Sequence, residues 1–227
     1  MLNPRKILSL LETASEKTAK ALVRRSDIAV VARGMEAHYN WRTKTLTVPA
    51  YSLRDDATEE HVLAWRGILD HECAHVEHSD GVVYDTFLAS WKGKFGHEQT
   101  RRAMTVANVF EDFFIERVWV LKNPGSVKHL AACNTLVIRE TGGAACCHPD
   151  YVAGGGTQPI GQFTALIQSM LRVGGGYVAM RDIDPKIASI LTHLADEIAV
   201  GMVATTSEEV CIAAEAVWTK LKDLAEK

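Results

Sequence analysis

The stretch from Leu69 to Gly81, which reads L-D-H-E-C-A-H-V-E-H-S-D-G, constrains this chain more than any other. Positions 71–75 form a complete H-E-x-x-H motif. Residues four apart lie on one face of an α-helix, so His71 and His75 can direct two imidazoles at one metal ion. Glu72 lies about 100° around the helix from His71, where its carboxylate can reach a water on that ion without being a ligand. The motif is typical of zinc hydrolases.

The residues around the motif predict a helix. Apolar side chains between Val62 and Leu69 recur at helical spacing, and Asp56 with Glu59 fits a capping box at the beginning. Gly81 is expected to end the helix, since glycine is common just beyond helix C-termini. A helix of about 23 residues is therefore expected, with the motif in its last turns.

A third protein ligand must come from elsewhere in the chain. His78 continues the histidine stripe, but His71 and His78 are separated by about 10.5 Å along a straight helix. Nitrogen ligands lie only about 2.0–2.1 Å from zinc, so one ion cannot bind His71, His75 and His78 while the helix stays regular. Asp80 better fits a supporting or turn residue. We expect the third ligand on another helix.

The composition excludes several classes of protein. The 227 residues suit a single domain, with the sheet and both site helices in 1–125 and a helical subdomain in 126–227. The contents of 47% hydrophobic and 23% charged residues are those of a globular chain. A net charge of −3 argues against nucleic-acid binding. Without a membrane-length apolar run or a signal peptide, and with five cysteines, the chain is expected to be cytoplasmic with reduced thiols.

The N-terminal region predicts a small antiparallel sheet beside helices. Residues 4–25 form an amphipathic helix, and 27–32 a short apolar strand. Residues 37–49 are typical of two strands around a turn at 42–44, with Pro49 ending a strand that suits a sheet edge. An extended peptide could pair with such an edge, although the sheet could equally serve only to cover the helices.

Two adjacent acids inside a second long helix are candidates for the third ligand. The helix is expected from about residue 100 to 121, and its centre, A-N-V-F-E-D-F-F-I-E-R-V, is very apolar. Asp112 shares a polar face with Glu116, which favours Asp112 as ligand with Glu116 supporting a ligand histidine. Glu111 lies among apolar neighbours, where a buried carboxylate is costly unless a metal or a partner stabilises it. We favour Glu111 and keep Asp112 as the alternative.

The rest of the chain is expected to form helices and one long loop. Helices are expected from Ser126 to about 137, and over 160–173, 185–202 and 207–225. The loop over 141–157 is glycine-rich and is expected at the rim of the site. Its Cys146, Cys147, His148 and Asp150 could bind a metal, but adjacent cysteines lack the spacing of structural zinc sites.

The two motifs resemble a known family. L-D-H-E-C-A-H-V-E-H-S-D followed by N-V-F-E-D-F-F-I-E-R-V is similar to the metallopeptidase-like segment of cobaltochelatase CobT-type proteins and their phage-encoded relatives. The von Willebrand A domain that often follows that segment, with its D-x-S-x-S motif, has no counterpart here. The wider likeness is to gluzincin-type zinc peptidases, whose third ligand is an acid on a later helix. The resemblance implies a zincin-like fold, His71 and His75 as zinc ligands, Glu72 as base, and Glu111 or Asp112 as third ligand.

These observations together predict a mainly α-helical α+β domain that binds one Zn²⁺. The leading hypothesis is a zinc metallopeptidase in which a metal-activated water cleaves a peptide or protein substrate and Glu72 is the general base. The alternative is a catalytically inactive, zinc-stabilised structural or adaptor protein, such as a virion or chelatase-like assembly component. Neither hypothesis includes a nucleic-acid or membrane partner.

Overall fold

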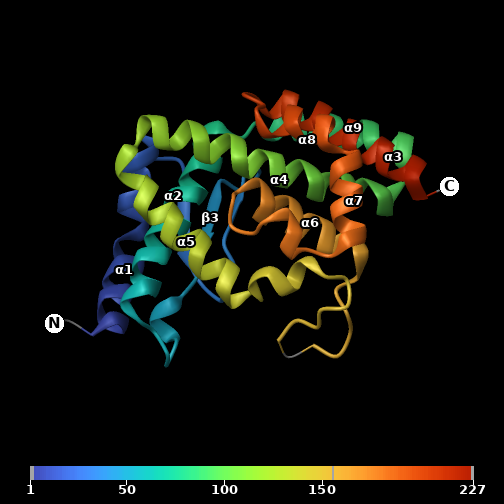
Figure 1. Ribbon diagram of the computed structural model, residues 1–227. Helices are drawn as coiled ribbons and strands as arrows, with labels where there is room; N and C mark the ends of the chain where they lie inside the picture. Colours follow the sequence, from blue (N-terminus) through green and yellow to red (C-terminus); the bar gives the residue numbers. More distant parts are fainter. Residues whose placement is uncertain (1–2, 155, 226–227) are drawn as a thin grey trace. The chain divides into compact units, whose positions relative to one another are not determined.

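The computed structural model describes residues 3–154 and 156–225 (Figure 1). Helices predominate and a three-stranded sheet lies near the N-terminus, so the predicted α+β class is confirmed. No helix in the described residues is long and apolar enough to cross a membrane. The chain divides into two units, Met1–Gly81 with Ile115–Val137, and Val82–Phe114 with Ile138–Lys227. The boundary expected at residue 125 falls inside the second segment of the first unit.

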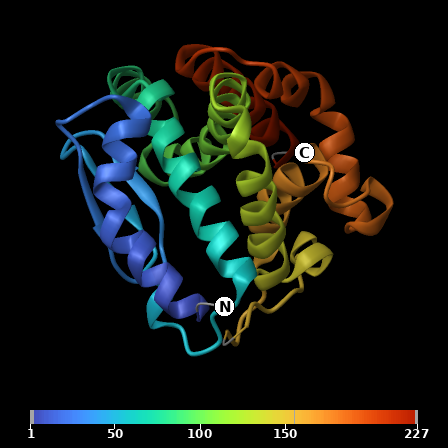
Figure 2. The ribbon, with the colours of Figure 1, turned by 90° about the vertical axis from the view of Figure 1, so that its left-hand side faces the viewer.

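Helix α1, Pro4–Val23, begins the first unit. The Asn3 side chain accepts a hydrogen bond from the backbone N–H of Arg5 at 2.9 Å, and Pro4 occupies the first helical position, where no N–H is needed. Its apolar face, with Leu8 and Ala19 fully buried, packs against the sheet and helix α2, Glu59–His78. Figure 2 shows α1 in blue lying in front of the strands.

The sheet contains β1 (Ala29–Ala32), β2 (His38–Asn40) and β3 (Thr45–Val48) in the order β1-β3-β2. The β2–β3 hairpin is antiparallel as predicted, but β1 pairs with β3 in parallel, so the sheet is mixed. The prediction of an edge strand before Pro49 is wrong, because β3 is central. Pro49 lies just after the strand, where its missing N–H removes no ladder bond.

Helix α2 differs from its expected ends. Thr58, not Asp56, is the N-cap, and its backbone N–H donates to Nδ1 of His61 at 3.1 Å, completing a capping box with His61 in place of an acid. The helix ends at His78, and Gly81 begins helix α3, Gly81–Phe95, rather than following a helix end. A Cβ at Gly81 would lie 2.2 Å from the Trp41 ring, so close packing explains the glycine.

Two further helices belong to both units. Helix α4, His97–Lys122, is unbroken, and helix α5, Val127–Glu140, follows a short 3-10 turn, η2, Pro124–Ser126. Ser126 ends that turn directly before α5, and its buried hydroxyl accepts a hydrogen bond from Nε1 of Trp119 at 3.1 Å. Another 3-10 turn, η1, spans Tyr51–Leu53 before α2.

Helix α5 packs very closely on α2 at Gly67. A Cβ on this residue would lie 2.1 Å from the backbone oxygen of His129 and 2.7 Å from Cβ of Cys133. Because the nearest atom belongs to backbone, the contact cannot be relieved by turning a side chain. Gly67 therefore sets how closely α5 approaches the helix that carries the H-E-x-x-H motif.

Gly67→Ala is expected to lower the free energy of unfolding by about 1–3 kcal/mol, because the overpacking strain outweighs alanine's better helix propensity. The matched control is Gly93→Ala in α3, where a Cβ would meet nothing within 4 Å. The control should be neutral or more stable by up to about 1 kcal/mol. Urea denaturation of both variants measures the difference, and equal effects would contradict the close packing.

In its described residues, the second unit contains helices joined by loops, with one isolated bridge between Val152 and Pro159. Its C-terminal part contains η3 (Gly143–Cys147), α6 (Gly161–Gly174), η4 (Met180–Asp182), α7 (Pro185–His193), α8 (Ala195–Met202) and α9 (Ser207–Ala225). The helix expected over 185–202 is thus two helices, divided at Leu194. In the loop expected at the site rim, Cys146 and Cys147 are buried in η3, and buried Arg172 donates to the backbone oxygen of Gly143 at 3.0 Å.

Candidate metal centre

Helix α2 places the two motif histidines side by side. The rings of His71 and His75 lie edge to face, with centroids 4.8 Å apart and planes at 82°. This follows from the four-residue spacing, which brings the two side chains onto one face of a regular helix. Both side chains are half-buried, so the pair is reachable by solvent.

Each histidine has a polar contact at Nδ1. Nδ1 of His71 lies 2.8 Å from Oε1 of Glu116, and Nδ1 of His75 lies 2.9 Å from Oγ of Ser79. An ionised carboxylate can only accept, so the His71 contact places the ring hydrogen on Nδ1. With Nδ1 of both rings engaged, Nε2 is the atom that would bind an ion, as metal-ligating histidines commonly do. Glu116 was expected from its spacing; Ser79, one turn beyond His75, was missed.

Asp112 joins the histidine pair. Helix α4 is unbroken, so Asp112 stands one turn before Glu116 on the same face. His71, His75 and Asp112 each offer one ligand atom, and these atoms lie within 4.8 Å of one another. Around a tetrahedral zinc, bond lengths of about 2.0–2.1 Å separate ligand atoms by roughly 3.4 Å, which small side-chain rotations could reach. Two imidazoles and a carboxylate are a donor set that suits zinc.

Glu111 lies in a different environment from its neighbour. Adjacent residues point about 100° apart around a helix, and Glu111 is 2% exposed. One of its carboxylate oxygens accepts a hydrogen bond from Oγ of Ser207, at the beginning of α9, at 2.8 Å. Burial and the charge of Glu111 raise the pKa of Tyr84 in α3. The structure thus brings Asp112 to the histidines and Glu111 to a buried polar contact in the second unit.

Glu72 is almost fully enclosed, at 3% exposure. Burial, followed by the charges of Glu116 and Glu72, raises the pKa of the Cys133 thiol on α5 to about 12. Both carboxylates therefore lie near this one thiol, which stays protonated and unreactive at neutral pH. A thiol at this position was not expected from the sequence, because nothing in the spacing of Cys133 relates it to the motif.

A buried polar contact supports the helix just before His71. Oδ2 of Asp70, which is 2% exposed, lies 3.0 Å from Nδ1 of His129 on α5. Arg66 lies one turn earlier on α2, with its Nε 3.9 Å from Oδ1 of Asp70. Together with the close packing at Gly67, these contacts hold α5 against the part of α2 that presents the motif.

His78, which the sequence had already excluded as a third ligand, lies against Trp119 rather than with the ligand group. Its ring lies edge-on to Trp119, with centroids 6.4 Å apart. Burial lowers the pKa of His78, which favours a neutral imidazole. It is not part of the group formed by His71, His75 and Asp112.

Comparisons with protein-family models, with curated proteins and with solved structures found no match to this chain.

Proposed function

We propose that this protein is a zinc-dependent peptidase with His71, His75 and Asp112 as metal ligands and Glu72 as general base. The observation that carries the proposal is the group of three ligand atoms within 4.8 Å, with Glu116 holding Nδ1 of His71. A zincin-like fold and kinship with the metallopeptidase-like segment of CobT-type proteins belong to the same proposal, and rest on the two sequence motifs.

The roles of the residues follow from their positions. Zinc, when bound, polarises a peptide carbonyl and lowers the pKa of water. Glu72 adjoins His71 on the helix, and takes the proton of the attacking water and returns it to the leaving amine. Glu116 and Ser79 orient the two imidazoles through Nδ1. Asp112 supplies the negative charge that balances part of the ion's charge.

The accessibility of the three ligands favours catalysis over a purely structural metal. Structural zinc sites are closed by four protein ligands, whereas catalytic sites have three and leave one position for water or substrate. His71, His75 and Asp112 make three, and all are half-buried rather than sealed in a core. A zinc-stabilised adaptor protein would not need this exposure, nor a carboxylate at Glu72.

Protein purified without chelators is expected to contain one zinc ion per chain. His71→Ala removes a ligand and should abolish stoichiometric zinc, and it should also lower the melting temperature, because bound metal stabilises the folded state. The matched control is His78→Ala on the same helix, which loses the Trp119 contact but should keep the metal. Elemental analysis and thermal denaturation give both values. Equal zinc contents in the two variants would contradict the site.

Activity is tested on the zinc-loaded protein with a library of random peptides, and new termini are read by mass spectrometry. Cleavage should disappear after chelation and return when zinc is added. Stoichiometric zinc without any cleavage would reject the peptidase proposal in favour of the structural alternative.

A further inference from the structure

A second candidate site lies in the second unit, at a cavity of about 630 Å³ formed by four helices. Its walls include aromatic and aliphatic side chains and two cations, which come from α4, α6, α7 and α9: Arg102, Phe163, Leu166, Ile190, Trp218 and Lys222. The volume lies within the range of natural small-molecule sites, which are mostly apolar with a few polar groups. The metal centre shares no residue with it.

The most informative wall residue is Trp218. Its ring packs edge to face against Phe163, with centroids 5.7 Å apart, and the residue is 4% exposed. Its indole Nε1 is buried and has no acceptor among the described residues. By contrast, Trp65, Trp91 and Trp119 each donate Nε1–H to an acceptor at 2.7–3.1 Å. A buried N–H without an acceptor costs free energy, and Trp218 forms part of the cavity wall, so its indole signal can report on a ligand that binds there.

The charge of the cavity indicates what kind of acceptor fits. The described residues that line it include Arg102 and Lys222 but no acid. The guanidinium carbon of Arg102 lies 5.5 Å from the centroid of the Phe163 ring, which holds this cation over the aromatic wall. Glu98 pairs with Arg102 at 3.1 Å, but both side chains are largely exposed, so the pair is weak and open to competition.

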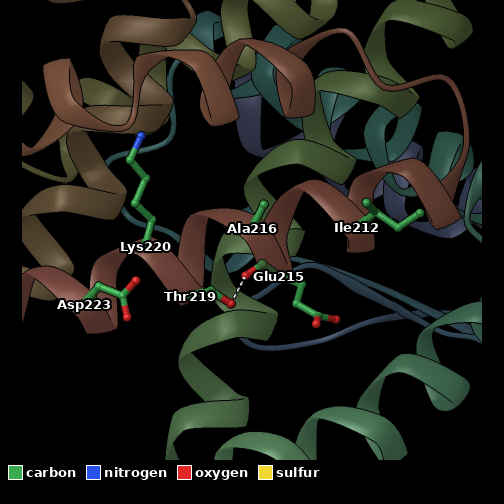
Figure 3. Close-up of a pocket in the computed structure, with 6 residues that line it drawn as sticks. All are labelled: Ile212, Glu215, Ala216, Thr219, Lys220 and Asp223. Atoms are coloured by element: carbon green, nitrogen blue, oxygen red, sulfur yellow. Dashed lines mark hydrogen bonds between the residues drawn. The ribbon is translucent and has the colours of Figure 1, made fainter.

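A shallower hollow along α9 provides a contrast (Figure 3). It measures about 460 Å³ and is lined by Ile212, Glu215, Ala216, Thr219, Lys220 and Asp223. Its main charged groups already have partners within the protein. Glu215 accepts from Nε1 of Trp91 and from Lys94, and Lys220 donates to Glu197 at 2.9 Å. This hollow therefore gives a ligand little to bind.

We propose that the cavity between α4, α6, α7 and α9 binds a small amphipathic organic anion, with a carboxylate head and an apolar body. The carboxylate would accept hydrogen bonds from the guanidinium of Arg102 and the ammonium of Lys222, since charge-assisted hydrogen bonds are the strongest available. The apolar body would cover Phe163, Leu166 and Ile190 and remove their surface from water. The proposal does not depend on the metal centre or on peptidase activity.

The test follows the tryptophan indole N–H signals of ¹⁵N-labelled protein by NMR during titration with octanoate. Trp218→Phe assigns the Trp218 signal, because it removes the N–H and keeps an aromatic ring. The Trp218 signal should shift saturably while the other indole signals stay in place. Octanol, with the same chain length and no charge, should bind at least about fivefold more weakly, because its hydroxyl carries no negative charge to pair with Arg102 and Lys222.

The charge requirement is tested on Arg102→Gln and Lys222→Gln. Each should weaken octanoate binding about fivefold or more. Arg101→Gln is the matched control, since Arg101 is an exposed neighbour on α4 outside the cavity lining, and its affinity should be unchanged. Equal affinity for octanol and octanoate, parallel shifts of all indole signals, or no saturable shift would each overturn the proposal.

Discussion

Glu72→Gln is expected to lower kcat/KM for any peptide cleaved by the wild-type protein by about 10²–10⁴-fold, the usual contribution of a general base. Glutamine keeps the shape and the hydrogen-bonding capacity of the side chain but cannot accept the proton of the attacking water. Because Glu72 is adjacent to the ligands rather than one of them, zinc content should remain at one ion per chain. Turnover, elemental analysis and melting temperature, measured on one preparation, separate these effects.

The matched control is Glu77→Gln. Glu77 lies on the same helix but forms an ion pair with Lys122, away from the group of three ligands. The Glu77→Gln variant should keep wild-type turnover and wild-type zinc content. If Glu72→Gln also retained turnover within a few-fold of wild type, Glu72 would not be the base, and the structural alternative would gain weight.

The helix that carries the motif could be predicted from sequence because its determinants are local. Apolar spacing and the four-residue interval of His71 and His75 depend only on helix periodicity. The role of Gly81 could not be predicted, because it depends on Trp41, which packs against the Gly81 backbone from forty residues earlier in the chain. A glycine required by tertiary packing looks the same in sequence as one required by a helix end.

In the sheet, too, local patterns predicted the local pairing but not the pairing between distant segments. The β2–β3 hairpin follows from two short strand patterns around a turn, so its antiparallel pairing was predictable. The parallel pairing of β1 with β3 depends on the path of the chain through β2, which strand patterns do not encode. The strand before Pro49 was therefore assigned to a sheet edge, because its pairing with β1 could not be predicted.

The acid pair shows what sequence can and cannot supply at the site. Sequence reasoning found Glu111 and Asp112, and favoured Glu111 because an apolar surrounding would make its charge costly without a metal. The structure offers another stabilising contact, the hydroxyl of Ser207, which lies 96 positions later in the chain. No local pattern could reveal that partner. The register of Asp112 with Glu116 was visible in the sequence, and it agrees with the observed Glu116–His71 contact.

Asp112→Asn is expected to weaken zinc binding by more than about 100-fold, because loss of a ligand should exceed the 10–100-fold effect typical of groups that support ligands. Glu116→Gln should fall within that supporting range, because an amide oxygen accepts from Nδ1 of His71 less strongly than a carboxylate does. Competition with a chromogenic chelator measures the affinity of each variant.

Glu111→Gln is the decisive comparison, because it removes a charge from the position next to Asp112. Its carboxylate accepts a hydrogen bond from Ser207, and its charge contributes to the raised pKa of Tyr84, so the substitution should change the stability of the second unit. Zinc affinity should stay within about threefold of wild type, because an unchanged ligand set should bind with nearly unchanged free energy. If zinc were lost from Glu111→Gln and retained by Asp112→Asn, Glu111 would be the third ligand. Helix α4 would then have to turn by about 100° to bring Glu111 to His71 and His75, which would break the contact between Glu116 and His71.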